Sequence, residues 1–100
     1  MSSILVADDE KSLQDFLVIM LEEDGYQVVT ASSVEKATKL IRENEFDLIL
    51  TDIRMGRSSG IDVLDAARKT LPDTPVVMMT AYASAETAVT AMKKGAYDYI

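Results

Sequence analysis

Short apolar runs alternate with amphipathic stretches along the whole chain. The first run, residues 3–7, is almost wholly apolar and is typical of a parallel strand that is covered on both faces. Similar strand patterns follow at residues 26–31, 48–51, 76–79 and 97–100. Because a helical pattern separates each strand from the next, the sequence predicts an α/β fold. This fold is a doubly wound parallel sheet of five strands with helices on both faces.

The stretches between the strands repeat their apolar residues with the period of an α-helix. The first stretch places on one face the side chains Leu13, Phe16, Leu17, Met20 and Leu21. Gly25 follows it as a C-terminal stop. In the second stretch, Ser32 and Glu35 have the spacing of a capping box, with Ser32 as the N-cap.

The second half of the chain continues the same alternation. Residues 54–60 are polar and rich in small side chains, which predicts a flexible loop. A helix is expected from Ile61 to Leu71, closed by Pro72. A short Ala-rich helix follows, which Ser84 can cap and Gly95 ends.

Two of the predicted strands lead directly into acidic residues. Asp8 and Asp9 follow the first strand, and Asp52 follows the third. In a sheet of order 2-1-3-4-5 these strands are neighbours, and their carboxyl ends lie where the strand order reverses. Three carboxylates at close range repel one another, so such a cluster needs a cation. Carboxylate ligands without histidine or cysteine favour a hard ion such as magnesium.

Each acid also has a simpler explanation when it is taken alone. Asp8 and Asp9 could cap the first helix, and Asp52 could be an ordinary loop-entry residue. The meeting of the two strand ends at one switch point favours a joint site instead. An ionised aspartate beside a metal ion can also attack phosphorus and form an aspartyl phosphate.

Two further side chains are candidates for the same edge of the sheet. Thr80 ends the fourth strand, so its hydroxyl could donate to a phosphoryl oxygen; without the acids, a bond to local backbone would be the simpler reading. Tyr99 in the fifth strand is either a core residue or a movable aromatic, and its position alone favours packing.

Composition narrows the function further. The 100 residues suffice for one domain, and 48% of them are hydrophobic. A net charge of -7 argues against nucleic acid as a direct partner. The absence of cysteine and histidine rules out disulfides and the usual zinc ligands. Without a signal-peptide pattern or a membrane-length apolar run, a cytoplasmic location is expected. The sequence contains no Gly-rich loop followed by Lys-Ser or Lys-Thr, which argues against a P-loop nucleotide enzyme.

Four motifs in combination resemble the receiver domain of two-component response regulators. They are Ala-Asp-Asp-Glu at 7–10, Thr-Asp-Ile-Arg-Met at 51–55, Met-Thr-Ala-Tyr at 79–82 and Lys-Lys-Gly-Ala-Tyr-Asp-Tyr-Ile at 93–100. The resemblance covers Ile4 to Ile100. The last two motifs are most similar to the receivers of enhancer-binding transcription activators of the nitrogen-regulation type. The resemblance implies a flavodoxin-like sheet in the order 2-1-3-4-5.

The resemblance also implies a role for each candidate residue. Asp52 would accept a phosphoryl group from a phosphohistidine of a sensor histidine kinase. Asp9, Asp52 and the backbone carbonyl of Arg54 would bind magnesium directly, with Asp8 acting through water. Thr80 and Tyr99 would form the switch pair. The chain would be a signalling module with at most weak self-catalysis, acting on ATPase and DNA-binding output domains of a full-length regulator.

The chain departs from the family pattern at its end. The family has a Lys-Pro and a fifth helix after the segment corresponding to residues 97–100, so we expect residues 1–100 to be a receiver domain truncated in or just after its fifth strand. Lys93 and Lys94 precede that strand and cannot replace the family lysine. The missing helix would leave the sheet face beside the first helix bare, to be covered by an oligomeric partner or an exchanged element. An alternative is a receiver remnant that takes no phosphate and serves as an interaction or oligomerisation module.

Overall fold

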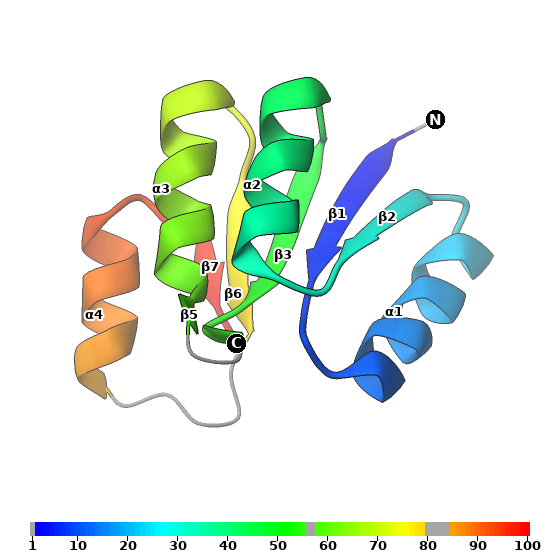
Figure 1. Ribbon diagram of the computed structural model, residues 1–100, viewed down its shortest axis with the longest axis horizontal. Helices are drawn as coiled ribbons and strands as arrows, with labels where there is room; N and C mark the ends of the chain where they lie inside the picture. Colours follow the sequence, from blue (N-terminus) through cyan, green and yellow to red (C-terminus); the bar gives the residue numbers. More distant parts are fainter. Residues whose placement is uncertain (1, 56–57, 80–84) are drawn as a thin grey trace.

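The computed structural model of the chain describes residues 2–55, 58–79 and 85–100, apart from the side chains of residues 85–88 and Tyr99. Within them, strands and helices alternate as the apolar pattern predicts (Figure 1). The first half contains β1 (Ser3–Ala7), α1 (Lys11–Glu23), β2 (Gln27–Ala31), α2 (Val34–Glu43) and β3 (Leu48–Asp52). The second half contains β4 (Arg54–Met55), β5 (Ser58–Ser59), α3 (Gly60–Thr70), β6 (Val76–Met79), α4 (Ala85–Lys93) and β7 (Asp98–Tyr99).

Five parallel strands form the main sheet in the order β2-β1-β3-β6-β7. This is the expected order 2-1-3-4-5, with β6 and β7 as its fourth and fifth strands. Ala7 of β1 is in register with Ala31 of β2 on one side and with Thr51 of β3 on the other. The carboxyl ends of β1 and β3 therefore lie side by side.

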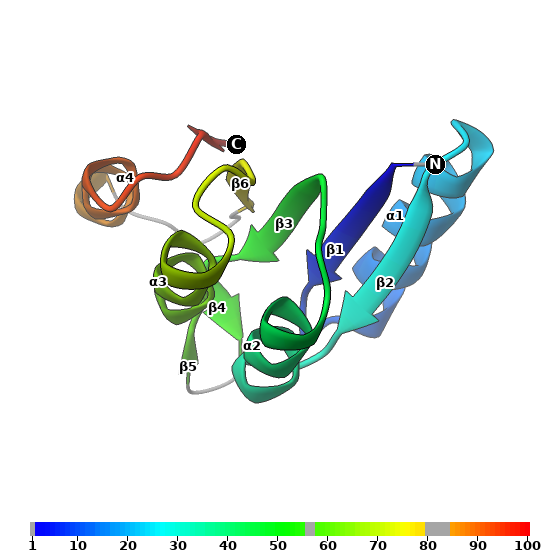
Figure 2. The same ribbon diagram turned by 90° about the horizontal axis from the view of Figure 1, so that it is seen from above.

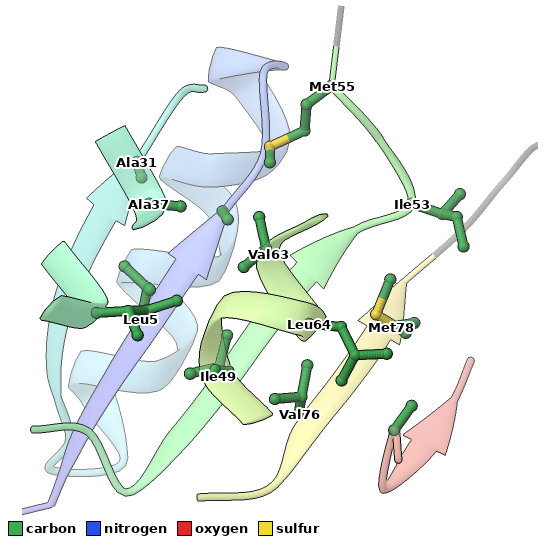
Figure 3. Packing of buried hydrophobic residues seen from close by; sticks show 14 of the residues in the cluster. Leu5, Ala31, Ala37, Ile49, Ile53, Met55, Val63, Leu64, Val76 and Met78 are labelled. Carbon is green, nitrogen blue, oxygen red and sulfur yellow. The ribbon is translucent and has the colours of Figure 1, made fainter. Parts of the chain in front are cut away.

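The larger core lies between the sheet and the pair α2 and α3, which share one face (Figures 1 and 2). Leu5, Ile49, Val76 and Met78 project from the strands toward this layer, and Leu64 of α3 meets them (Figure 3). All five side chains are fully buried. β1 is buried on both faces, so its sequence is a continuous apolar run, whereas β3 is fully buried only on the side of α2 and α3.

The opposite face carries α1 and a smaller core of Ile4, Val6 and Leu17. The sequence placed Leu13, Phe16 and Met20 on the buried face of this helix, and that prediction is wrong. Phe16 is 60% exposed and Ile19 is 61% exposed. The helix turns Leu17 and Leu21 inward, and no element of the described chain packs over the remaining apolar side chains.

Two local predictions also need correction. Ser33, not Ser32, is the N-cap of α2, and its hydroxyl accepts the Lys36 N–H at 3.1 Å. With Ser33 as the N-cap, the third helical position is Lys36 rather than Glu35, so the expected capping box does not form. The expected loop at residues 54–60 contains the antiparallel pair β4–β5, and Met55 within it is buried. A pattern of small polar residues hides this pairing because only the buried methionine contributes a hydrophobic signal.

The loop between α3 and β6 is tied down by Arg68. Its guanidinium donates to three backbone carbonyl oxygens: Nη1 to Pro72 at 3.0 Å, and Nη2 to Leu71 at 3.5 Å and to Thr74. The Thr74 hydroxyl donates in turn to the Phe46 carbonyl oxygen at 2.9 Å. These contacts fix the amino end of β6 beside that of β3, opposite the acidic residues. Among the described residues, no helix is long and apolar enough to cross a membrane.

Candidate functional site

Asp8, Asp9 and Asp52 come together at the carboxyl ends of β1 and β3. One oxygen from each carboxylate can be chosen so that the three lie within 4.8 Å of one another. The parallel register explains this arrangement, because Ala7 and Thr51 are paired and the acids are the next residues along each strand. The structure thus brings together the three acids that the sequence pattern assigned to one site.

Asp8 is the most enclosed member of the cluster, at 1% exposure. Its Oδ1 accepts the Glu10 N–H at 2.8 Å, whereas its Oδ2 is buried and has no hydrogen-bond partner among the described residues. The N-cap of α1 is Glu10, which makes no side-chain capping bond. Asp8 therefore does not act as an ordinary N-cap, and it keeps a buried oxygen available for a cation.

Asp52 is the last residue of β3 and is held by the backbone that follows it. Its Oδ1 accepts the Arg54 N–H at 3.3 Å. This bond draws the carboxylate toward the turn into β4. The backbone carbonyl of Asp52 also lies directly against Gly60, the first residue of α3.

The electrostatics of the cluster favour cation binding. Burial raises the pKa of Asp8, and the negative charges of Asp52 and Asp9 raise it further, against the lowering effect of the Glu10 N–H. Burial likewise raises the pKa of Asp52; the Arg54 and Ile53 backbone amides lower it, and Asp9 and Glu10 raise it. A divalent ion would reverse these effects by stabilising the ionised forms. Oxygen ligands alone, one of them buried and without a partner, fit a hard ion such as magnesium or calcium.

The other predicted site residues are placed as follows. Arg54 has an exposed side chain in β4, and its backbone adjoins Asp52. Thr80 lies outside the described residues. The backbone of Tyr99 is in β7, in register with Met78, and its side chain is outside the described part. Lys94, which precedes the fifth strand and was not expected to replace the family lysine, lies with its Nζ 3.4 Å from Oδ1 of Asp65 on α3.

One polar residue beside the cluster escaped the sequence interpretation. Gln14 of α1 is buried, and its Nε2 donates to the carbonyl oxygens of Asp8 at 3.1 Å and Ala31 at 3.4 Å. A signal for it does exist, because Gln14 shares a helical face with Leu17 and Leu21 at i, i+3 and i+7. A polar residue in line with two inward apolar residues is a candidate for a buried hydrogen bond.

Comparison with known proteins is in keeping with this geometry. Residues 4–100 match the response regulator receiver domain family. The chain is 45% identical over 97 residues to the transcriptional regulatory protein ZraR of Escherichia coli and 42% identical over 97 residues to the alginate biosynthesis regulator AlgB of Pseudomonas aeruginosa. Each match covers 97% of this chain and 22% of the relative, so the chain spans about a fifth of these regulators.

Solved structures agree with this result. A response regulator from Burkholderia pseudomallei, containing a phosphorylated aspartic acid and a calcium ion, is similar with a TM-score of 0.94 and 34% identity, over 99% of this chain and 58% of that one. The beryllofluoride-activated NtrC4 receiver domain has a TM-score of 0.90 and 39% identity, over 99% of this chain and 82% of that one. The chain therefore belongs to the response regulator receiver domains of two-component signalling, with transcriptional regulators among its relatives.

Proposed function

We propose that this chain is a phosphorylation switch in which Asp52 accepts a phosphoryl group from the phosphohistidine of a sensor kinase. A carboxylate oxygen of Asp52 attacks phosphorus, the bond from phosphorus to the imidazole nitrogen breaks, and an acyl phosphate forms on Asp52. The imidazole leaves with the bonding electron pair and takes a proton from solvent. Transfer occurs once per cycle, so the chain is a phosphoacceptor with at most weak self-catalysis.

The convergence of the three carboxylates is the observation that carries this proposal. The three acids lie within 4.8 Å of one another, and burial with neighbouring negative charges raises the pKa of Asp8 and of Asp52, so a cation in the site would favour their ionised forms. The relative from Burkholderia pseudomallei holds a phosphorylated aspartic acid and a calcium ion. That precedent supports a phosphoacceptor here, and the position of Asp52 at the strand end supports it as the acceptor.

We propose magnesium as the cofactor, held by Asp8, Asp9, Asp52 and the Arg54 backbone carbonyl. When bound, the ion supplies positive charge that screens the incoming phosphoryl oxygens from the carboxylates. Asp8 and Asp9 would hold the ion beside Asp52, whose carboxylate would supply the nucleophile. Thr80 is proposed to donate to a phosphoryl oxygen, and Tyr99 to be the aromatic of the switch.

The proposed partners follow from the family and from the relatives. A sensor histidine kinase supplies phosphate, and ATPase and DNA-binding domains of a longer regulator provide the output, in the cytoplasm. The exposed apolar side chains of α1 support one further contact, in which another chain or an exchanged element covers this face. The same exposed face favours the second candidate function, an interaction or oligomerisation module that takes no phosphate.

Incubation with acetyl phosphate and magnesium separates the two functions. Mass spectrometry should show one added phosphoryl group on the wild-type protein and none on Asp52→Asn. Asp47→Asn is a matched control, because Asp47 is exposed and lies at the amino end of β3. If wild type gains no mass while it still binds magnesium, the interaction module is the better account.

A further inference from the structure

Gln14 is a buried amide that joins three elements just behind the acidic cluster. It is 6% exposed, and its Nε2 reaches the carbonyl oxygen of Asp8 at 3.1 Å and that of Ala31 at 3.4 Å. Asp8 follows β1, Ala31 ends β2, and Gln14 belongs to α1. One carboxamide therefore connects two adjacent strand ends to the helix that follows the first of them.

The peptide units on either side of Asp8 are held by a closed set of hydrogen bonds. The Asp8 N–H donates to the Ala31 carbonyl at 3.0 Å, and Oδ1 of Asp8 accepts the Glu10 N–H at 2.8 Å. The Gln14 N–H donates to the Glu10 carbonyl at 3.1 Å, within the first turn of α1. Gln14 supplies the side-chain bond to the Asp8 carbonyl, so its side chain restrains the plane of the peptide that leads from Asp8 to Asp9.

We propose that Gln14 is a positioning residue of the cation site, holding the Asp8–Asp9 peptide so that both carboxylates face Asp52. This inference rests on the proposed function, because it concerns the same magnesium site. The acids repel one another, and a peptide free to rotate would relieve the repulsion by turning the Asp8 and Asp9 side chains apart. The amide of Gln14 opposes this rotation without touching the ion or the phosphoryl group.

The chemistry of an amide suits this position. The end of the Gln14 side chain lies beside two carbonyl oxygens, so the residue at this position must donate hydrogen bonds rather than accept them. A glutamate would present only acceptors when ionised and would add a fourth negative charge beside Asp8, Asp9 and Asp52. A methionine has similar length and shape but cannot donate, so Gln14→Met removes the bonds while conserving the packing.

Magnesium affinity is the readout that separates positioning from simple stabilisation. Isothermal titration of the purified protein with magnesium chloride should give a dissociation constant that is about tenfold or more higher for Gln14→Met than for wild type, as for other residues that orient metal ligands. Thr74→Val is the matched control, since the Thr74 hydroxyl also donates to a backbone carbonyl, that of Phe46 at 2.9 Å. Thr74 is buried at the other end of the sheet, so this variant should lose stability without losing affinity.

A second measurement on wild type keeps the inference testable if Gln14→Met does not fold. The side-chain amide protons of Gln14 should exchange slowly with solvent by NMR, and more slowly again when magnesium is added. Exchange at the rate of a free glutamine, or a Gln14→Met affinity within twofold of wild type, would overturn the inference. If wild type itself binds no magnesium, the metal site of the proposed function fails and the positioning role fails with it. Wild-type binding with an unaffected Gln14→Met variant refutes the positioning role alone.

Discussion

The carbonyl oxygen of Asp52 occupies the space where a side chain on Gly60 would begin. A Cβ built on Gly60 would lie 1.8 Å from this oxygen and 2.9 Å from the carbonyl carbon. Gly60 is the first residue of α3, and its N–H donates to the Ile53 carbonyl at 2.8 Å. The helix start thus packs directly on the backbone of the proposed phosphoacceptor, a contact that only glycine permits.

Gly60→Ala should therefore damage both the fold and the site. The clash is with backbone, which cannot rotate away, so we expect a loss of about 1–3 kcal/mol or more in the free energy of unfolding, measured by urea titration. The displaced Asp52 should also bind magnesium more weakly. Gly25→Ala is the control: Gly25 has φ +90 and open space around it, so alanine there adds local strain of about 1–2 kcal/mol and leaves magnesium affinity unchanged. Equal magnesium affinity in both variants would contradict this coupling.

The raised pKa values of Asp8 and Asp52 predict how stability depends on pH without divalent cations. A carboxyl with a higher pKa in the folded state binds its proton more tightly there, so stability falls as pH rises from the ordinary value of 3.8 through the folded pKa, and then levels off. Asp52→Asn should remove its part of this fall and be more stable than wild type at neutral pH in the presence of EDTA.

Urea midpoints measured between about pH 4 and pH 8 would test this sign. Asp73→Asn is a control for the change in net charge, because Asp73 is exposed in the loop before β6. Magnesium should reverse the ranking of wild type and Asp52→Asn, since the ion binds the ionised cluster. If the wild-type protein and Asp52→Asn changed in stability with pH in the same way over this range, burial would not disfavour the ionised Asp52, and the prediction would be wrong.

Removing the hydrogen bonds of Arg68 should lower the stability of the fold without changing magnesium affinity. Arg68→Met keeps much of the apolar stem, which runs past Gly95, and removes the donors to Leu71, Pro72 and Thr74. The loss should be about 1.5–3 kcal/mol, because hydrogen bonds from a charged group are among the stronger ones. Lys69→Met on the exposed side of α3 should cost less than about 0.5 kcal/mol. Magnesium affinity should be the same in both, as the loop lies at the amino end of β6.

The exposed face of α1 predicts association with another chain. Phe16 and Ile19 are each more than half exposed, and a double Phe16→Ser, Ile19→Ser variant should shift sedimentation profiles toward monomer at a given concentration. Leu17→Ser on the buried side should instead unfold the protein. A wild-type chain that sediments as a compact monomer and melts cooperatively at low concentration would contradict the proposed covering of this face.

The strands and the acidic cluster could be predicted because their signals are strong and local. β1 is buried on both faces and is therefore apolar almost throughout, and β1 and β3 each lead straight into an acid. Topology then brings Asp8, Asp9 and Asp52 together without any further information. The family motifs agreed with this reading because they contain the same acids.

The inward face of α1 and the contacts behind the site could not be predicted in the same way. Two adjacent apolar stripes fit the helical period, and only packing decides that Leu17 and Leu21 face the sheet while Phe16 does not. The approach of Gly60 to Asp52 is a contact between backbones, which leaves no trace except the glycine itself. Gln14 was overlooked because a polar residue on a helix is normally read as solvated.

The early place of β1 and β3 in the sequence also bears on how the chain assembles during synthesis. All three acids belong to the β1 and β3 strand ends, and both strands leave the ribosome before β6 and β7 do. Since domains begin to organise from the amino terminus, a nascent chain that has reached α3 already contains all three proposed acidic ligands, together with Gly60 at the start of that helix. If the cluster binds magnesium as proposed, the ion would stabilise the emerging chain as a folding ligand before the last strand of the sheet is added.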